Sequence, residues 1–277
     1  MDISSLVIRF CYWDSSVFNS KAIHQNISVR QVACTFTSLL LCFSIAAQTR
    51  VLKRFSAIEA IDHRTDYDLV ITDRGLPGTV QIEGPKDAVG LVTSSLRDGV
   101  LYIAAEPTRN FLPDIPFFDA RLEVRHKIKI TVSCRGLTRI KTEGSGTLSA
   151  NNFRFRDLSI NALGDSKVDF SKCEFYSLET DLSGSSRAQF LNSEAVDVRL
   201  KIQGDGAVDA HTLRAKNLDA RIFGAGRITA YPRELLKARV TGKGAILYRG
   251  NPSSLEKEVT EGGRVEKYLD VGLQNLE

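Results

Sequence analysis

Four aspartates are spaced so that their carboxylates could work in pairs. Asp165 and Asp205 each follow a glycine, and Asp169 and Asp209 repeat the same separation along the chain. Paired carboxylates cleave polysaccharides as general acid and base, so this is the chemistry that the spacing suggests. In stacked strands, a pair two units apart would be separated by roughly 10 Å. The unit between them offers no third acid, so we interpret all four as polar structural residues and predict no catalytic residue.

Histidine and cysteine, which also do chemistry, are scattered along the chain. His63, His126 and His211 belong to no His-Glu-x-x-His or Cys-x-x-Cys motif, so no metal site is predicted. Cys134 and Cys173 are interpreted as small buried apolar residues, with a disulfide between them as the alternative. No Gly-x-Ser-x-Gly segment marks a nucleophilic serine. The chain is therefore predicted not to be an enzyme.

The sequence LKIQGDGAVDA at residues 200–210 contains a Gly-x-Gly, which occurs in phosphate-binding loops and in β-turns. A phosphate-binding loop occurs once in a domain and leads into a helix. Here the first glycine recurs at a nearly constant interval, at Gly144, Gly164, Gly184, Gly204, Gly224, Gly242 and Gly262. Four units have a second glycine, at Gly146, Gly206, Gly226 and Gly244. We interpret these glycines as structural turns and predict no cofactor.

The residues on both sides of each glycine alternate between apolar and polar with period two, which is typical of β-strands. Before Gly204, for example, the apolar positions are Val198, Leu200 and Ile202. One such unit cannot bury its apolar side chains alone, whereas stacked units form a continuous interior. The sequence therefore predicts an all-β fold, a parallel β-helix-like solenoid with coils of about 20 residues.

Polar and aromatic residues also repeat in this register. Five residues before the glycine the sequence has Ser159, Glu179, Arg199 and Asp219, and three before it has Asn161, Asp181, Lys201 and Arg221. Opposite charges would often stack between neighbouring coils, and we interpret them as a solvated face. The aromatic side chains in phase with the inward residues are predicted to form an internal stack, rather than a platform for sugars. They are Phe155, Phe170, Phe175 and Phe190.

The repeat divides the chain into parts. Residues 48–135 alternate without a clean period and are expected to form less regular strands, interrupted by a Pro-rich loop at 107–118. Residues 136–250 carry the regular repeats, and beyond Tyr248 the pattern weakens into a cap or a tail, with 269–277 as the tail. Residues 48–268 are thus predicted to form a single β-solenoid domain.

Residues 1–47 are predicted to be a signal peptide. The apolar run at 32–47 follows Lys21 and Arg30 and ends on small residues, as a secretory leader does. A buried helix and a membrane anchor are the alternatives, although the run is shorter than the roughly 20 residues that span a bilayer. The mixed segment before Lys21 is unusual in a leader, so we expect a mis-called start and initiation near Val29. The protein would then be secreted, to the periplasm or the cell envelope.

The quoted segments together resemble a family. FSAIEAI from Phe55, VQIEGPKDAV, LRDGVLYI, the turns that follow LTRIKTEGSG, and ARVTGKGAILYRGNP resemble the DUF2807 family of secreted bacterial proteins, an auto-transporter adhesin head domain, from about Phe55 to Tyr268. The resemblance implies a right-handed β-helix-like fold, an envelope or extracellular location and no established activity. Two turns lack the second glycine, and with no membrane barrel after Glu277 we do not expect self-export.

These observations favour a secreted, non-enzymatic β-solenoid, an adhesin or a surface or periplasmic binding module. Contact along a coil face or the ridge of turns is expected, with a cell-surface protein or a polysaccharide as candidate partner and membrane contact only through the leader. A net charge of +4 without a basic block argues against nucleic acid. Two alternatives stay open: a carbohydrate-active β-helix enzyme, either polysaccharide lyase or hydrolase, and a self-assembling envelope scaffold that stacks end to end.

Overall fold

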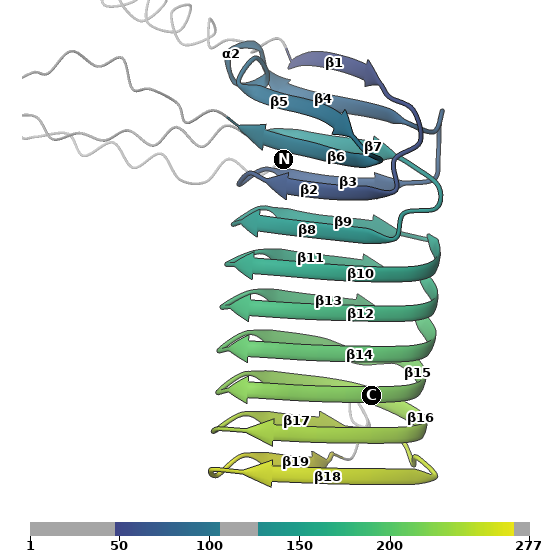
Figure 1. Ribbon diagram of the computed structural model, residues 1–277, viewed down its shortest axis with the longest axis vertical. Helices are drawn as coiled ribbons and strands as arrows, with labels where there is room; N and C mark the ends of the chain where they lie inside the picture. Colours follow the sequence, from purple (N-terminus) through teal and green to yellow (C-terminus); the bar gives the residue numbers. More distant parts are fainter. Residues whose placement is uncertain (1–47, 106–126, 269–277) are drawn as a thin grey trace, which may run out of the picture. The chain divides into compact units, whose positions relative to one another are not determined.

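The described residues form an almost entirely β structure in which strands stack one above another (Figure 1). The computed structural model describes residues 48–105 and 127–268. The predicted leader, the Pro-rich loop at 107–118, His126 and the tail at 269–277 lie outside these ranges.

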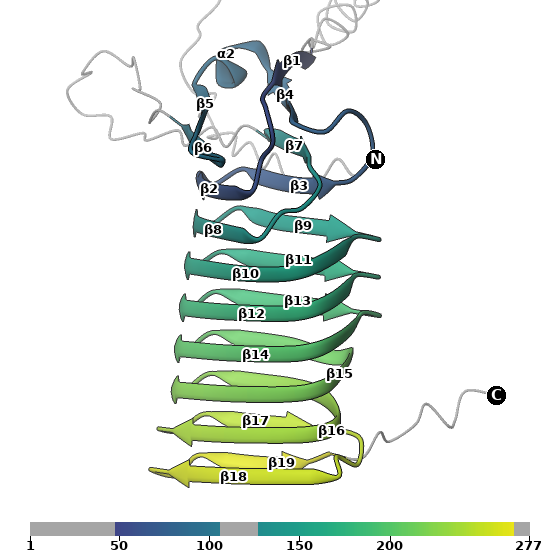
Figure 2. The same cartoon turned by 45° about the vertical axis from the view of Figure 1, so that its right-hand side comes forward.

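Each regular coil contains a long strand, a glycine turn and a short strand, because the sequence alternates with period two on both sides of the glycine. Figure 2 shows the long strands on one wall of the stack and the short strands behind them. The coil strands are, in chain order, β2 (Ala60–Arg64), β3 (Asp68–Thr72), β8 (Arg139–Gly144), β9 (Thr147–Asn151), β10 (Arg154–Gly164), β11 (Lys167–Ser171), β12 (Glu174–Gly184), β13 (Arg187–Leu191), β14 (Glu194–Gly204), β15 (Ala207–Gly224), β16 (Arg227–Thr241), β17 (Ala245–Tyr248), β18 (Ser254–Thr260) and β19 (Arg264–Lys267).

Neighbouring coils pair in parallel and in register, so that equivalent residues of successive units lie side by side. Gly164 lies beside Gly184, and Gly184 beside Gly204. The expected parallel solenoid, with one coil for each sequence repeat, is therefore confirmed. Its interior is the column of inward side chains, of which Ile160, Leu200 and Ile222 are fully buried.

The predicted internal aromatic stack is present. Phe155, Phe170 and Phe175 lie nearly parallel, with ring centroids 5.4–6.2 Å apart. Phe190 meets Phe170 edge-on at 6.0 Å. All four are buried, so they fill the core of these coils and offer no surface to a sugar.

The first coil is made of β2 and β3, which precede the regular repeats in the chain. β2 pairs in parallel with β8, and β3 with β9. The described strands that lie between β3 and β8 in sequence are not part of this coil. The glycine repeat of the sequence does not extend to this coil. Its turn is made of Thr65, Asp66 and Tyr67, which occupy the place of Gly144, Ser145 and Gly146.

The excursion between the first two coils covers one end of the stack. β6 (Val100–Ala105) and β7 (Lys129–Ser133) continue the parallel stack over β2 and β3. Antiparallel strands then follow, with β5 (Val92–Arg97) on β6, and β4 (Thr79–Pro85) between β7 and β1 (Gln48–Arg54). The one-turn helix α2 (Lys86–Val89) buries Ala88 and Val89 at this end, so the hydrophobic interior is capped here.

At the other end the coils run further than expected. The sequence beyond Tyr248 suggested a cap or tail, but β18 pairs with β16, and β19 with β17, in the parallel register of the stack. The pattern weakens in sequence because lysines take inward positions: Lys257 lies beside Ala238, and Lys267 beside Tyr248.

The first glycine of each turn adopts a left-handed backbone conformation, with φ between 78° and 128° from Gly144 to Gly242. Non-glycine residues rarely adopt this conformation. Where the second glycine is missing, Ser166 and Ser186 take its place, and the Ser186 hydroxyl donates to the carbonyl oxygens of Gly164 and Ser183. The hydroxyl thus contacts two backbone acceptors at the turn, and Gly164 and Gly184 have a φ near 80°, whereas the turns with two glycines have a φ of 111–128°.

Candidate functional site: the charged face of the long strands

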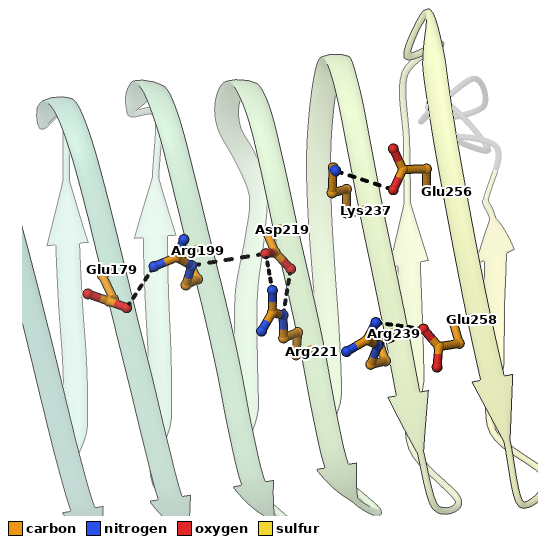
Figure 3. Close-up of polar contacts among 8 residues, drawn as sticks. All are labelled: Glu179, Arg199, Asp219, Arg221, Lys237, Arg239, Glu256 and Glu258. Carbon is orange, nitrogen blue, oxygen red and sulfur yellow. Dashed lines mark hydrogen bonds and ion pairs between the residues drawn. The ribbon is translucent and has the colours of Figure 1, made fainter.

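Charged side chains line the outer wall of the long strands in two columns (Figure 3). The first column takes one outward residue from each coil, and the second takes the outward residue two positions further along. We call the following eight residues the charged face: Glu179, Arg199, Asp219, Arg221, Lys237, Arg239, Glu256 and Glu258. They come from strands β12, β14, β15, β16 and β18.

Ion pairs between coils follow the alternation of charge in the first column. Arg199 Nη1 lies 3.2 Å from Glu179 Oε1, and its Nε lies 4.0 Å from Asp219 Oδ2. Further along, Lys237 Nζ lies 3.3 Å from Glu256 Oε2. The opposite charges that the sequence placed in register therefore meet, as predicted.

The second column has like charges on neighbouring coils, since Arg221 lies beside Arg239. Each of these arginines has its own carboxylate. Arg221 binds Asp219 on the same strand through two hydrogen bonds of 2.9 and 2.7 Å, and Arg239 Nη2 lies 2.7 Å from Glu258. The hydrogen bonds with Asp219 raise the pKa of Arg221.

These pairs contribute little to stability, because water screens them. The side chains of Arg199 and Glu179 are 56% and 43% exposed, and pairs of this kind contribute about 0.2–1 kcal/mol each. The face holds four cations and four anions, so it presents alternating charge rather than one sign. Such a pattern confers selectivity on contact with a partner more than it confers stability on the fold.

The charged face is hollowed. A depression of about 500 Å³ is lined by Glu179, Arg199, Asp219 and Lys237, among others. A second of about 290 Å³ shares Asp219 and Lys237 and extends to Glu258. Neither is an enclosed ligand pocket, but together they form an uneven polar surface along several coils.

The four aspartates of the catalytic alternative lie elsewhere. Asp165 and Asp205 are exposed at the tips of glycine turns. Asp169 and Asp209 lie on the short-strand wall, in one column with Gln189 between them. Burial raises the pKa of Asp169, against the opposing effect of Lys167.

One polar cluster on the short-strand wall escaped the sequence analysis. Asp209 Oδ1 lies 2.6 Å from His211 Nδ1 and accepts a hydrogen bond of 2.7 Å from the Thr229 hydroxyl, beside a groove of about 450 Å³. Burial would raise the pKa of Asp209, but the hydrogen bonds from Thr229 and His211 lower it. Because Thr229 donates to the carboxylate and not to the imidazole, the three do not form a nucleophile–base–acid relay. In the sequence, Asp209 and His211 two residues apart on one face of a predicted strand were the sign of this cluster.

The remaining candidate residues are structural. His63 is fully buried, with Nε2 2.7 Å from the Thr65 hydroxyl and Nδ1 3.3 Å from that of Thr142. Cys134 and Cys173 are buried free thiols, as predicted, and burial raises the pKa of Cys134 to about 12. Within residues 48–105 and 127–268, no cluster of three metal-ligating side chains occurs.

Short parallel coils that turn on glycines, stacked and covered at one end, define the class of the protein, a β-solenoid with a polar outer wall. Within this class, the chain belongs to the DUF2807 family, described as "Putative auto-transporter adhesin, head GIN domain", whose model matches residues 55–252. The expected family membership is thus confirmed. No curated protein matches the sequence.

Several solved structures share the fold. A "putative adhesin" from Bacteroides fragilis is 24% identical with a TM-score of 0.68, and the match covers 80% of this chain and 97% of that one. A "putative adhesin" from Parabacteroides merdae is 19% identical, with a TM-score of 0.59 and coverage of 82% and 98%. A "putative lipid binding protein" from Parabacteroides distasonis is also 19% identical, with a TM-score of 0.59 and coverage of 80% and 97%. At these identities the likeness establishes the architecture alone.

None of the helices in the described ranges is long and apolar enough to cross a membrane.

Proposed function

We propose that the protein is an exported, non-enzymatic adhesin-like module that binds a partner at the cell surface or in the periplasm through the charged face. Family membership supports the adhesin-like role. The observation that carries the choice of face is the row of side chains that project outward from successive coils, from Glu179 to Glu258. The register of the coils fixes the positions of these residues, although their ion pairs contribute little to the stability of the fold.

Protein is the class of partner that this face fits best. A uniformly acidic polysaccharide would meet Glu179, Asp219, Glu256 and Glu258 as well as the cations, and repulsion would offset the attraction. A protein surface can present charges of both signs in a complementary order.

Binding of the fluorescently labelled mature protein to intact bacterial cells tests the proposal, with untreated, protease-treated and periodate-oxidised cells compared. We expect binding to untreated cells, its loss after protease treatment and its retention after oxidation. A variant with Arg199→Glu and Arg239→Glu should bind at least tenfold more weakly, since each reversal places like charges together.

A matched control reverses two cations on the opposite wall, with Lys167→Glu and Arg187→Glu in β11 and β13. This control should bind as the wild type does. Equal binding by both variants would refute the charged face as the contact surface, and loss of binding on oxidation alone would identify a glycan partner.

The enzyme alternative is tested separately. Acidic and neutral polysaccharides incubated with the protein should release no reducing or unsaturated ends. Release that disappears in an Asp169→Asn or Asp209→Asn variant would instead establish a carbohydrate-active β-helix.

Export rests on the sequence alone, because residues 1–47 lie outside the described ranges. Sequencing the N-terminus of the protein recovered from the cell envelope should find the mature chain beginning close to residue 48. A full-length chain in the cytoplasm would contradict export.

A further inference from the structure

The last coil, made of β18 and β19, leaves the hydrophobic interior incompletely covered. Leu255 and Val259 are each 41% exposed, although their partners in the preceding coil, Leu236 and Val240, are fully buried. Among the described residues, β18 pairs only with β16 and β19 only with β17, so the outer edges of both strands are open (Figure 1). An open edge of this kind is a template for pairing with a second copy of the chain.

Lys257 lies across this opening. It stands beside buried Ala238, so its side chain starts out toward the interior. Its ammonium then reaches the opposite wall, where Nζ donates to the carbonyl oxygen of Val265 at 3.3 Å. It also lies 5.3 Å from the centre of the Tyr248 ring, within the range of a cation–π interaction.

A second lysine takes an inward position on β19. Lys267 stands beside buried Tyr248, and its Nζ lies 3.5 Å from the side-chain oxygen of Asn251. In the preceding coil the equivalent inward positions are Ala238 and Tyr248, so the cations belong to the last coil. Inward-pointing charges on edge strands are a device by which β-proteins avoid pairing edge to edge.

We propose that Lys257 and Lys267 form a charged lid on the open end of the solenoid that prevents a second copy of the chain from stacking on it. A copy stacked on this coil would remove both ammonium groups from water. Burying such charges without a carboxylate partner is strongly unfavourable. The lid therefore disfavours the end-to-end scaffold.

The test replaces both lysines, with Lys257→Val and Lys267→Val, and follows sedimentation velocity of the mature chain over a range of concentrations. The wild type should remain monomeric, and the double variant should associate to at least twice the monomer mass. A control with Lys167→Val and Arg187→Val removes two cations from the middle of the stack and should stay monomeric. A folded double variant that also stays monomeric would overturn the proposal.

Hydrogen exchange on the unmodified protein gives a second test that needs no variant. If the lid keeps the end free, exchange of the β18 and β19 amides should not depend on protein concentration. Protection of these amides that grows with concentration would show that copies pair at this end in spite of the lysines, and would overturn the proposal even if the double variant failed to fold.

Discussion

Single glycines determine whether the coils can stack. A Cβ atom on Gly224 would lie 2.6 Å from the carbonyl oxygen of Gly204 in the preceding coil, and φ at Gly224 is 128°. Backbone atoms cannot move aside without disturbing the neighbouring coil. Strain and collision therefore act together at this position.

We expect Gly224→Ala to lower the free energy of unfolding by about 3 kcal/mol, of which about 1–2 kcal/mol comes from the left-handed backbone. Gly262→Ala is the control, because Gly262 has a φ of 81° but nothing within 4 Å of the added Cβ. Gly262→Ala should lower the free energy of unfolding only by the part that comes from the left-handed backbone, about 1–2 kcal/mol. Equal losses in urea unfolding would show that contact between coils does not constrain the glycines.

His63 makes the stability depend on pH. Burial lowers its pKa from 6.5 to about 4, although Asp66, Asp62 and Asp68 act in the opposite direction. The unfolded chain therefore binds a proton at a higher pH than the folded chain. The contribution of neutral His63 is complete above pH 6.5 and is lost as the pH falls toward 4, by about 3 kcal/mol.

A His63→Gln variant, which keeps a polar side chain between Thr65 and Thr142 but does not titrate, should lose this part of the pH dependence. Urea unfolding at pH 7 and at pH 4 measures it for both proteins. Parallel curves for wild type and variant would contradict a buried neutral imidazole.

At the scale of single residues, the sequence predicted the turn glycines but not the polar cluster on the short-strand wall. The turn glycines are visible because they recur at a nearly constant interval. The cluster of Asp209, His211 and Thr229 was missed because its members are ordinary polar residues, although the register that the repeat predicts places Asp209 beside Thr229.

The second corner of the coil recurs at the same interval as the glycine turn, but with other residue types. Asn152, Lys172 and Asn192 stand one coil apart from each other and all adopt a left-handed conformation, with φ of 48–55°. Asparagine tolerates this conformation better than lysine does. The corner thus uses residue types less distinctive than glycine.

Lys172→Gly should accordingly stabilise the protein by about 0.5–1 kcal/mol, since glycine removes the left-handed strain at the cost of some chain entropy. The same change at Lys167, at the start of the neighbouring strand β11, should destabilise it by a similar amount. Urea unfolding of the two variants should move the midpoint in opposite directions, and a shift in the same direction would contradict the corner geometry.

The ion pairs between long strands are expected to matter for binding rather than for folding. Arg199→Met should lower the free energy of unfolding by less than about 1 kcal/mol, because both of its carboxylate partners remain in contact with water. A larger loss in thermal or urea unfolding would mean that the charged face holds the coils together, which would weaken its assignment as a contact surface.

For the whole molecule, the repeat predicted the architecture but not its limits. The first coil is hidden because Thr65, Asp66 and Tyr67 replace the glycine turn, and Asp66 accepts hydrogen bonds from the backbone and hydroxyl of Ser145 instead. The last coil keeps its turn glycine, Gly262, but Lys257 and Lys267 interrupt its apolar alternation. Ends of a solenoid must differ from its middle, so a periodic pattern is least informative there.

The two ends also differ from each other. Antiparallel strands and α2 cover the interior at one end, whereas at the other the two lysines lie over it. These different ends support the proposal that the molecule binds a partner along its long wall and does not extend by stacking.

The most direct test of the coil architecture is a set of spin-label distances along the first column of the long-strand wall. This column has one residue per coil: Arg139, Ser159, Glu179, Arg199, Asp219, Lys237 and Glu256. With a spacing of about 4.8 Å per coil, the Cα atoms of Arg139 and Asp219 should be about 19 Å apart, and those of Arg139 and Glu256 about 29 Å apart. Pulsed electron paramagnetic resonance on these two label pairs should find a difference of about 10 Å, which is two coil spacings. Equal distances, or a difference far from two coil spacings, would contradict the stacked solenoid.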